Sequence, residues 1–235
     1  MVQPDRSVSD TLPLLDDMRP RTATDQIYEA LYERVVDLSL PPGARLSEAE
    51  VAARMGVSRQ PVRDAFYRLS QQGFIQIRPQ RATVVTRISE EAIRRAHFIR
   101  EALEVACMRE AATRLTEQQH DALDDLLTQQ ETAVAADDRS LFHALDEQFH
   151  HDICDHSGLG FVWTLIKDNK GHMDRARYLS LSYNAATALG EHRVILAALR
   201  ARDAGTAVRA IIAHLSRIDE TLERLRIEQP EMLER

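Results

Sequence analysis

The chain has 235 residues, of which 44% are hydrophobic and 29% charged, and its formal net charge is −7. This length allows two domains with buried cores, and this composition excludes an intrinsically disordered protein. No apolar run reaches membrane-spanning length, and the first residues lack the apolar core of a signal peptide, so we expect no membrane partner and a cytoplasmic location. Cys107 and Cys154 lie in apolar helical patterns, which suggests buried thiols in a reducing compartment.

Residues 22–88 have the pattern of a winged helix-turn-helix, preceded by an arm at 1–21 for which we expect flexibility. A first amphipathic helix ends at the Pro-Pro-Gly turn 41–43. Two further helices follow, and then two β-rich runs, 74–77 and 83–86, predict a small hairpin that forms the wing.

The second and third helices are marked by their start and stop signals. Ser47 is expected to cap the second helix, which ends before the turn at Gly56. Ser58 is expected to cap the third helix through its hydroxyl oxygen, and Pro61 falls in the first turn, where a missing N–H has no cost. The residues that recur at helical spacing and pack inward are Val62, Ala65, Phe66 and Leu69.

Positive charge is concentrated on this part of the chain. Residues 45–87 contain eight arginines and three acidic residues, a net charge of +5, whereas residues 89–235 have a net charge of −8. A compact basic segment within an acidic protein is typical of a DNA-binding module. Arg59, Gln60 and Arg63 lie on the outer side of the third helix, and such side chains bond base edges or phosphates in the major groove.

Five sequence blocks in residues 22–88 resemble the DNA-binding domain of GntR-type transcription regulators: PPGARLSE at 41–48, GVSRQPVRDAF at 56–66, RL at 68–69, QGF at 72–74 and RPQRA at 78–82. The resemblance implies DNA contacts from Arg45 in the first block and from the start of the third helix, and a wing contact from Arg81. Ala82 departs from the family, which usually has glycine there. The residues implied at the start of the third helix are Ser58, Arg59, Gln60 and Arg63.

From Ser89 onward the sequence has no strand-like run, and we expect an all-helical bundle over residues 89–235. A long helix opens at Ser89-Glu90-Glu91, with acidic residues in its first turn. The further helices are expected at 117–136, 139–156, 159–180, 185–203 and 205–228. Together with the N-terminal blocks, this layout resembles the FadR-type C-terminal ligand-binding domain, known as FCD.

One acidic residue and three histidines border the apolar faces of these helices. Asp146 and His150 are four residues apart and share a helix face, while His192 and His214 fall in register with apolar residues of two later helices. A single histidine beside an apolar face is more often a hydrogen-bonded core residue than a ligand. As a set, these four resemble the metal-binding pattern of FCD domains, which implies a divalent metal ion: Zn²⁺ first, with Ni²⁺ or Mn²⁺ as alternatives.

Arg100 interrupts an apolar helix face, one turn before Glu104. From the residues alone it either forms an exposed ion pair with Glu104 or directs its guanidinium into a cavity to bind a carboxylate. The FCD resemblance favours the second interpretation. Arg175 and Arg177 either add affinity for an anion or are solvated.

These features together predict a transcription regulator, in the main hypothesis a repressor, that binds a pseudo-palindromic double-stranded DNA operator as a homodimer. A small organic acid bound beside the metal would control its affinity for DNA. Two alternatives remain: a metal sensor without an organic effector, and, less favoured, a helical metallohydrolase. The hydrolase lacks a convincing general base, since Glu147 is rotated away from Asp146 on the helix.

Overall fold

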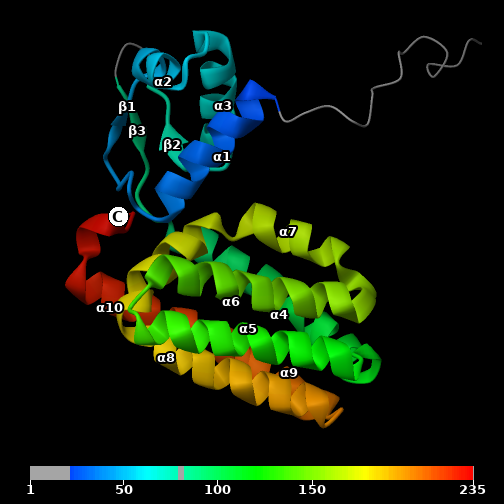
Figure 1. Ribbon diagram of the computed structural model, residues 1–235. Coiled ribbons are helices and arrows are strands. Elements are labelled where there is room, and N and C mark those ends of the chain that lie inside the picture. Colours follow the sequence, from blue (N-terminus) through cyan, green and yellow to red (C-terminus); the bar gives the residue numbers. More distant parts are fainter. Residues whose placement is uncertain (1–21, 79–81, 235) are drawn as a thin grey trace, which may run out of the picture.

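The computed structural model describes residues 22–78 and 82–234, which form two domains stacked one above the other (Figure 1). The first is a small winged domain and the second is a bundle of long helices. This arrangement confirms the predicted fold class, a mainly α protein with a winged helix-turn-helix followed by an all-α bundle. The predicted boundary between residues 88 and 89 falls at Ser89, the N-cap of the first bundle helix, and remains a prediction.

The winged domain begins with a helix whose N-terminus is held by a capping box. Thr22 and Asp25 form a capping box at the start of α1 (Ala23–Val36), each side chain accepting a backbone N–H of the other. The domain continues through β1 (Arg45–Leu46), α2 (Glu48–Met55), α3 (Arg59–Gln71), β2 (Ile75–Gln76) and β3 (Thr83–Val85). Its core is a single apolar cluster that includes Ile27, Val35, Val62, Phe66, Leu69 and Phe74.

The sheet of the winged domain contains one strand more than the predicted hairpin. β3 pairs antiparallel with β2 on one side and with β1 on the other, and Arg45 lies opposite Val84. The run Arg45–Leu46 is too short for the alternation of apolar and polar residues by which a strand is recognised in a sequence.

The helical domain contains α4 (Glu90–Arg114), α5 (Glu117–Ala135), α6 (Arg139–Cys154), α7 (Phe161–Asn169), α8 (Gly171–Arg200), α9 (Ala204–Leu215) and α10 (Arg217–Glu228). A π-helical turn (Asp155–Leu159) joins α6 to α7, and a short 3₁₀ turn (Pro230–Met232) follows α10. None of the helices in the described part of the chain combines the length and apolar character needed to cross a membrane.

Two predicted helix boundaries in this domain are wrong. The break expected between 180 and 185 does not exist, because those residues contain no Gly or Pro and α8 runs unbroken through them. The break instead lies at Lys170, between α7 and α8. Gly171 then packs so closely on Phe74 of the winged domain that a β-carbon would lie 2.4 Å from the phenyl ring, so only glycine fits there. The helix expected at 205–228 also divides, at Ser216.

Candidate metal centre and nucleic-acid interface

Helix α3 presents a polar outer face and an apolar inner face, as its sequence predicts. Val62, Ala65, Phe66 and Leu69 are buried against the winged domain, while Arg59, Gln60 and Arg63 are exposed. Gly56 ends α2 in the left-handed conformation (φ +67°), which turns the chain into α3. The turn thus sets the first residues of α3 on the surface, as in helix-turn-helix domains that place this end in the major groove.

The exposed polar residues of α3 are held by acidic neighbours. The Arg63 guanidinium lies 3.3 Å from a carboxylate oxygen of Glu48, and the Gln60 amide donates to Asp64 at 2.9 Å. Ser58 is the N-cap residue, but its side chain makes no capping hydrogen bond, so that detail of the prediction is wrong. Arg45 is exposed on β1, and Arg81 lies outside the described residues.

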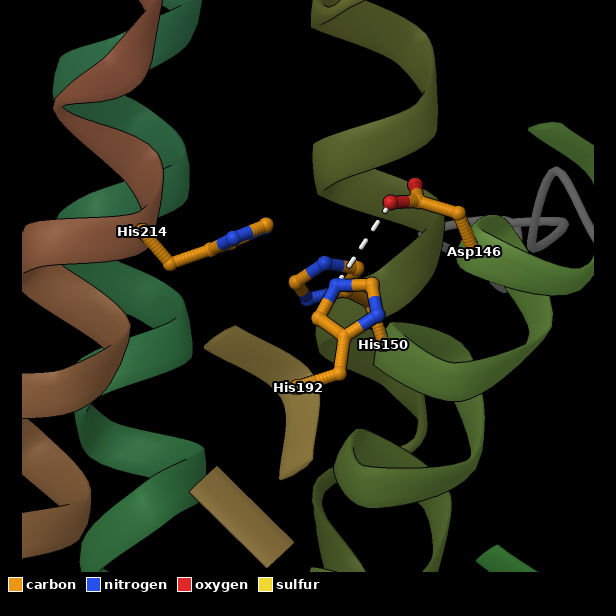
Figure 2. Close-up of side chains that lie close together, drawn as sticks. All are labelled: Asp146, His150, His192 and His214. Atoms are coloured by element: carbon orange, nitrogen blue, oxygen red, sulfur yellow. Dashed lines mark ion pairs between the residues drawn. The ribbon is translucent and has the colours of Figure 1, made fainter. Parts of the chain in front are cut away.

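Asp146 and His150 of α6, His192 of α8 and His214 of α9 meet inside the helical domain (Figure 2). All four are buried, and each offers one ligand atom within 4.8 Å of the others. The His192 and His214 ring centroids are 4.7 Å apart, and Nε2 of His192 lies 3.5 Å from Oδ1 of Asp146. The fold therefore gathers at one point four side chains that the sequence distributes over three helices.

Each imidazole of this cluster is oriented by an oxygen atom behind it. The Nδ1 atoms lie 2.7 Å from Glu104 for His150, 2.8 Å from Gln130 for His192 and 2.8 Å from Glu191 for His214. An Nδ1–H bond to such an oxygen leaves Nε2 as the lone-pair nitrogen. All three rings are thus prepared to donate Nε2 toward the centre of the cluster.

Several atoms at the centre of the cluster are buried without a hydrogen-bond partner, namely Oδ1 of Asp146, Nε2 of His150 and Nε2 of His192. Buried polar atoms in native proteins are almost always paired, so three such atoms facing one point indicate a bound group. Three imidazole nitrogens and one carboxylate oxygen suit Zn²⁺, and also Ni²⁺ or Mn²⁺. The residues present therefore fit a divalent transition-metal ion.

The electrostatic surroundings keep the carboxylate charged and two of the imidazoles neutral. Burial by itself would raise the pKa of Asp146, but Arg177, which bonds its second oxygen, and the nearby imidazoles hold that pKa well below its usual value. Burial lowers the pKa of His192 well below its usual value and also lowers the pKa of His214. Metal ions bind ionised carboxylates and neutral imidazoles, so these protonation states favour binding.

Comparison with known proteins assigns both domains. The profile of bacterial regulatory proteins of the gntR family matches residues 23–85, and the FCD domain profile matches residues 96–217, just over half of the chain. The chain belongs to the GntR family. Among its relatives, the HTH-type transcriptional repressor RspR of Escherichia coli K12 is 39% identical over 205 residues, covering 86% of this chain and 90% of RspR. An uncharacterised HTH-type regulator of Streptomyces ambofaciens is 38% identical over 214 residues, covering 90% of each chain.

Solved structures share this fold. The E. coli protein McbR/YncC superposes with a TM-score of 0.74 at 23% identity, covering 87% of this chain and 99% of that one. A GntR regulator from Rhodococcus sp. RHA1 has a TM-score of 0.71 at 21% identity, with 85% and 97% covered. The two profiles and the relative RspR, together, identify this GntR-family protein as a DNA-binding transcription regulator with an FCD domain.

In the FCD domain of this GntR regulator, Arg100 matches neither of its two sequence interpretations fully. Its side chain is buried rather than exposed, and Nε donates to Glu104 at 2.6 Å. Its Nη2 atom is buried without a partner, and the residue lines a pocket together with Asp146 and His214. Arg100 thus both pairs with Glu104 and borders the cavity at the metal cluster.

Several residues of this GntR regulator's site were not predicted, or were predicted only as alternatives. Arg175 and Arg177 are both buried or nearly so, and Arg177 binds Asp146 and lines the same pocket. Gln130 and Glu191 were missed entirely. Gln130 left a signal in the sequence, because it follows Leu123 and Leu127 on the apolar face of α5, where an amide needs a partner.

Proposed function

We propose that this GntR regulator is a repressor whose affinity for its operator is set by a small carboxylate bound at a metal ion in the FCD domain. The observation that carries the proposal is the convergence of three oriented imidazoles and one ionised carboxylate on a single buried point beside a pocket. The repressor assignment is supported by the relative RspR, which is named a transcriptional repressor. As a regulator of DNA, the protein would act in the cytoplasm.

The metal would be held by Asp146, His150, His192 and His214, with Zn²⁺ as the first choice and Ni²⁺ or Mn²⁺ as alternatives. When bound, the ion would supply a Lewis-acidic anchor for an anionic oxygen. Arg177 would keep one oxygen of Asp146 occupied and so leave Oδ1 to face the cluster.

Arg100 would bind the carboxylate of the effector. Its guanidinium uses Nε for Glu104 and keeps Nη2 unpaired in the pocket wall, so a donor remains for an incoming anion. Charge-assisted bonds of this kind are strong where water is excluded. Ser180, Asn184 and Thr187 also line the pocket and would bond polar groups at the other end of a small acid.

DNA would be contacted by Arg45, Ser58, Arg59, Gln60 and Arg63, with Arg81 from the wing. A homodimer would present two copies of α3 to a pseudo-palindromic operator. We infer that the dimer uses the outer faces of α4 and α7, because these packed helices expose Phe98 (74%), Phe161 (68%) and Leu165 (48%). Large apolar side chains exposed together on adjacent elements are typical of protein interfaces.

A metal sensor without an organic effector is the second candidate, since the same four ligands would serve it. A metallohydrolase is less favoured, because its nearest candidate base, Glu147, is already bound by Lys170 and Arg177. Without a free base beside the metal, activation of water loses its proton acceptor.

The test is a titration of DNA binding, using a duplex that the protein itself selects from a random pool. The apoprotein, the zinc-loaded protein and the zinc-loaded protein with a panel of short carboxylic acids are compared in the wild type and in Arg100→Lys. Lysine keeps the positive charge beside Glu104 but lacks the planar guanidinium with its several N–H donors. We therefore expect the effect of the acids on DNA affinity to weaken while zinc binding persists. A response to zinc alone, unaffected by any acid, would favour the metal sensor.

A further inference from the structure

The junction between the two domains, residues 86–89, is held on one side by the start of α8. The Arg175 guanidinium donates to the carbonyl oxygen of Thr86 at 2.7 Å and to that of Arg87 at 3.5 Å. The backbone N–H of Ser89 donates to Nδ1 of His172 at 3.3 Å. These bonds attach the junction to the same helix that carries His192.

On its other side the junction is held by the segment that follows α10, residues 230–234. The N–H of Ile88 donates to the carbonyl of Met232 at 2.8 Å, and the N–H of Glu234 donates to the carbonyl of Ile88 at 3.0 Å. Ile88 and Leu233 form an isolated parallel bridge, and both side chains are buried. Figure 1 shows this end of the chain beside the point where the domains meet.

The same segment is connected to the metal cluster through α10. One carboxylate oxygen of Glu191 lies 2.8 Å from Nδ1 of His214. The other oxygen accepts a hydrogen bond at 2.7 Å from Nε of Arg217, the first residue of α10. Further along α10, Leu222 and Leu225 pack in one apolar cluster with Ile88 and Leu233. One carboxylate therefore contacts both a candidate metal ligand and the helix that positions the segment.

We propose that residues 230–234 form a clasp that fixes the junction, and that the clasp carries the state of the metal cluster to the winged domain. The backbone N–H and C=O of Ile88 both bond to this segment, so release of the segment leaves these two groups of a junction residue unpaired and the junction open. A change at His214 would reach the clasp through Glu191, Arg217 and α10. The regulatory half of this inference rests on the proposed function, whereas the clasp itself does not.

The first experiment measures opening of the junction by limited trypsin digestion of the full chain at the Arg87–Ile88 bond. Arg87 is exposed, so cleavage depends on how often the backbone around Ile88 opens. Glu234→Pro removes the N–H that donates to Ile88, and the extended Leu233 (φ −91°, ψ 150°) accepts a following proline. Glu234→Ala is the matched control, because it loses the same carboxylate and keeps the N–H.

We expect cleavage at Arg87–Ile88 about 2- to 12-fold faster in Glu234→Pro than in Glu234→Ala, the range for loss of one hydrogen bond. A chain ending at Gln229 should be cleaved faster still. Circular dichroism should show that Glu234→Pro and the shortened chain keep the helical content of the wild type. Equal cleavage rates in the proline and alanine variants, together with an unaccelerated shortened chain, would overturn the clasp.

The second experiment measures the change in DNA affinity on adding zinc, with the self-selected duplex. The clasp predicts that the chain ending at Gln229 binds zinc as tightly as the full chain but loses at least half of the zinc-induced change in DNA affinity. If the full chain shows no zinc response, the proposed function fails while the digestion result still decides the clasp. An intact zinc response in a shortened chain whose junction opens would overturn the regulatory role.

Discussion

Nδ1 of His150 lies 2.7 Å from a carboxylate oxygen of Glu104, although the two residues are 46 positions apart and belong to different helices. Glu104 in turn accepts from Arg100 at 2.6 Å. Burial opposes ionisation of Glu104, but Arg100 and His150 more than compensate and lower its pKa. The pocket arginine, the buried carboxylate and the imidazole therefore form one charged unit that sets the ring orientation of His150.

Because His150 faces the cluster, we expect its removal and the removal of the adjacent His151 to have different effects on zinc content. His150→Ala should reduce zinc in the purified protein from stoichiometric to near zero, because it removes a donor from the cluster. His151→Ala should leave zinc stoichiometric, since His151 pairs with Asp152 away from the cluster. Elemental analysis after dialysis against zinc checks both. Equal zinc content in the two variants would exclude His150 as a ligand.

The residues behind the imidazoles should tune metal affinity without being ligands. Gln130→Leu removes the oxygen that holds His192, and we expect zinc affinity to fall about 10- to 100-fold. Gln129→Leu is the control, because Gln129 is exposed on the same helix and bonds only a backbone carbonyl. Competition with a chromogenic chelator measures both affinities. A Gln130 variant that binds zinc like the wild type would show that the outer oxygen is dispensable.

The outer face of α3 should carry much of the affinity for DNA. Arg63→Ala should weaken binding to the self-selected duplex by about 1–3 kcal/mol, the range for an arginine that contacts a base. Arg193→Ala is the control, because Arg193 is similarly exposed, 51% against 59%, but lies on α8 and pairs with Glu131. Fluorescence anisotropy gives both affinities. Similar losses in the two variants would indicate a general effect of charge.

His172 should make stability depend on pH. Burial lowers its pKa from 6.5 to about 4 in the folded protein. Below pH 6.5 the unfolded chain binds a proton that the folded chain does not, so stability falls as the pH falls and levels off near pH 4. The loss should approach about 3 kcal/mol. Urea unfolding between pH 4.5 and 7.5 measures it, and His172→Gln should have a shallower slope. Parallel profiles in the two proteins would contradict the assignment.

The fold could be read from local patterns, and so could the inward position of the four residues of the metal cluster, whereas their selection as ligands came from the resemblance to FCD domains. Asp146 and His150 are one helical turn apart, and His192 and His214 keep the register of the apolar residues around them, so helical periodicity alone places all four inward. Gly56 and Pro61 likewise mark the turn and the start of α3. These features depend on neighbours within a few residues, which the sequence displays directly.

The remaining features depend on contacts between distant segments. Gln130 meets His192 across 62 positions, and no local pattern pairs them. The break between α7 and α8 comes at Lys170, a buried lysine that pairs with Asp174 at 2.6 Å and with Glu147. A lysine in a helix predicts no break, and the close packing of Gly171 on Phe74 is a contact between two domains that no local pattern displays.

The unbroken helix α8 connects the contact with the winged domain to the metal cluster. His172, which stacks on Phe74 with ring centroids 5.0 Å apart, and His192 belong to one helix and are separated by twenty residues, about 30 Å at the α-helical rise. Over that length a tilt of about 2° moves the far end by about 1 Å, enough to break a hydrogen bond such as the one between Arg175 and Thr86. We therefore expect an adjustment at His192 that is too small to repack the bundle to produce a larger displacement where the helix meets the winged domain.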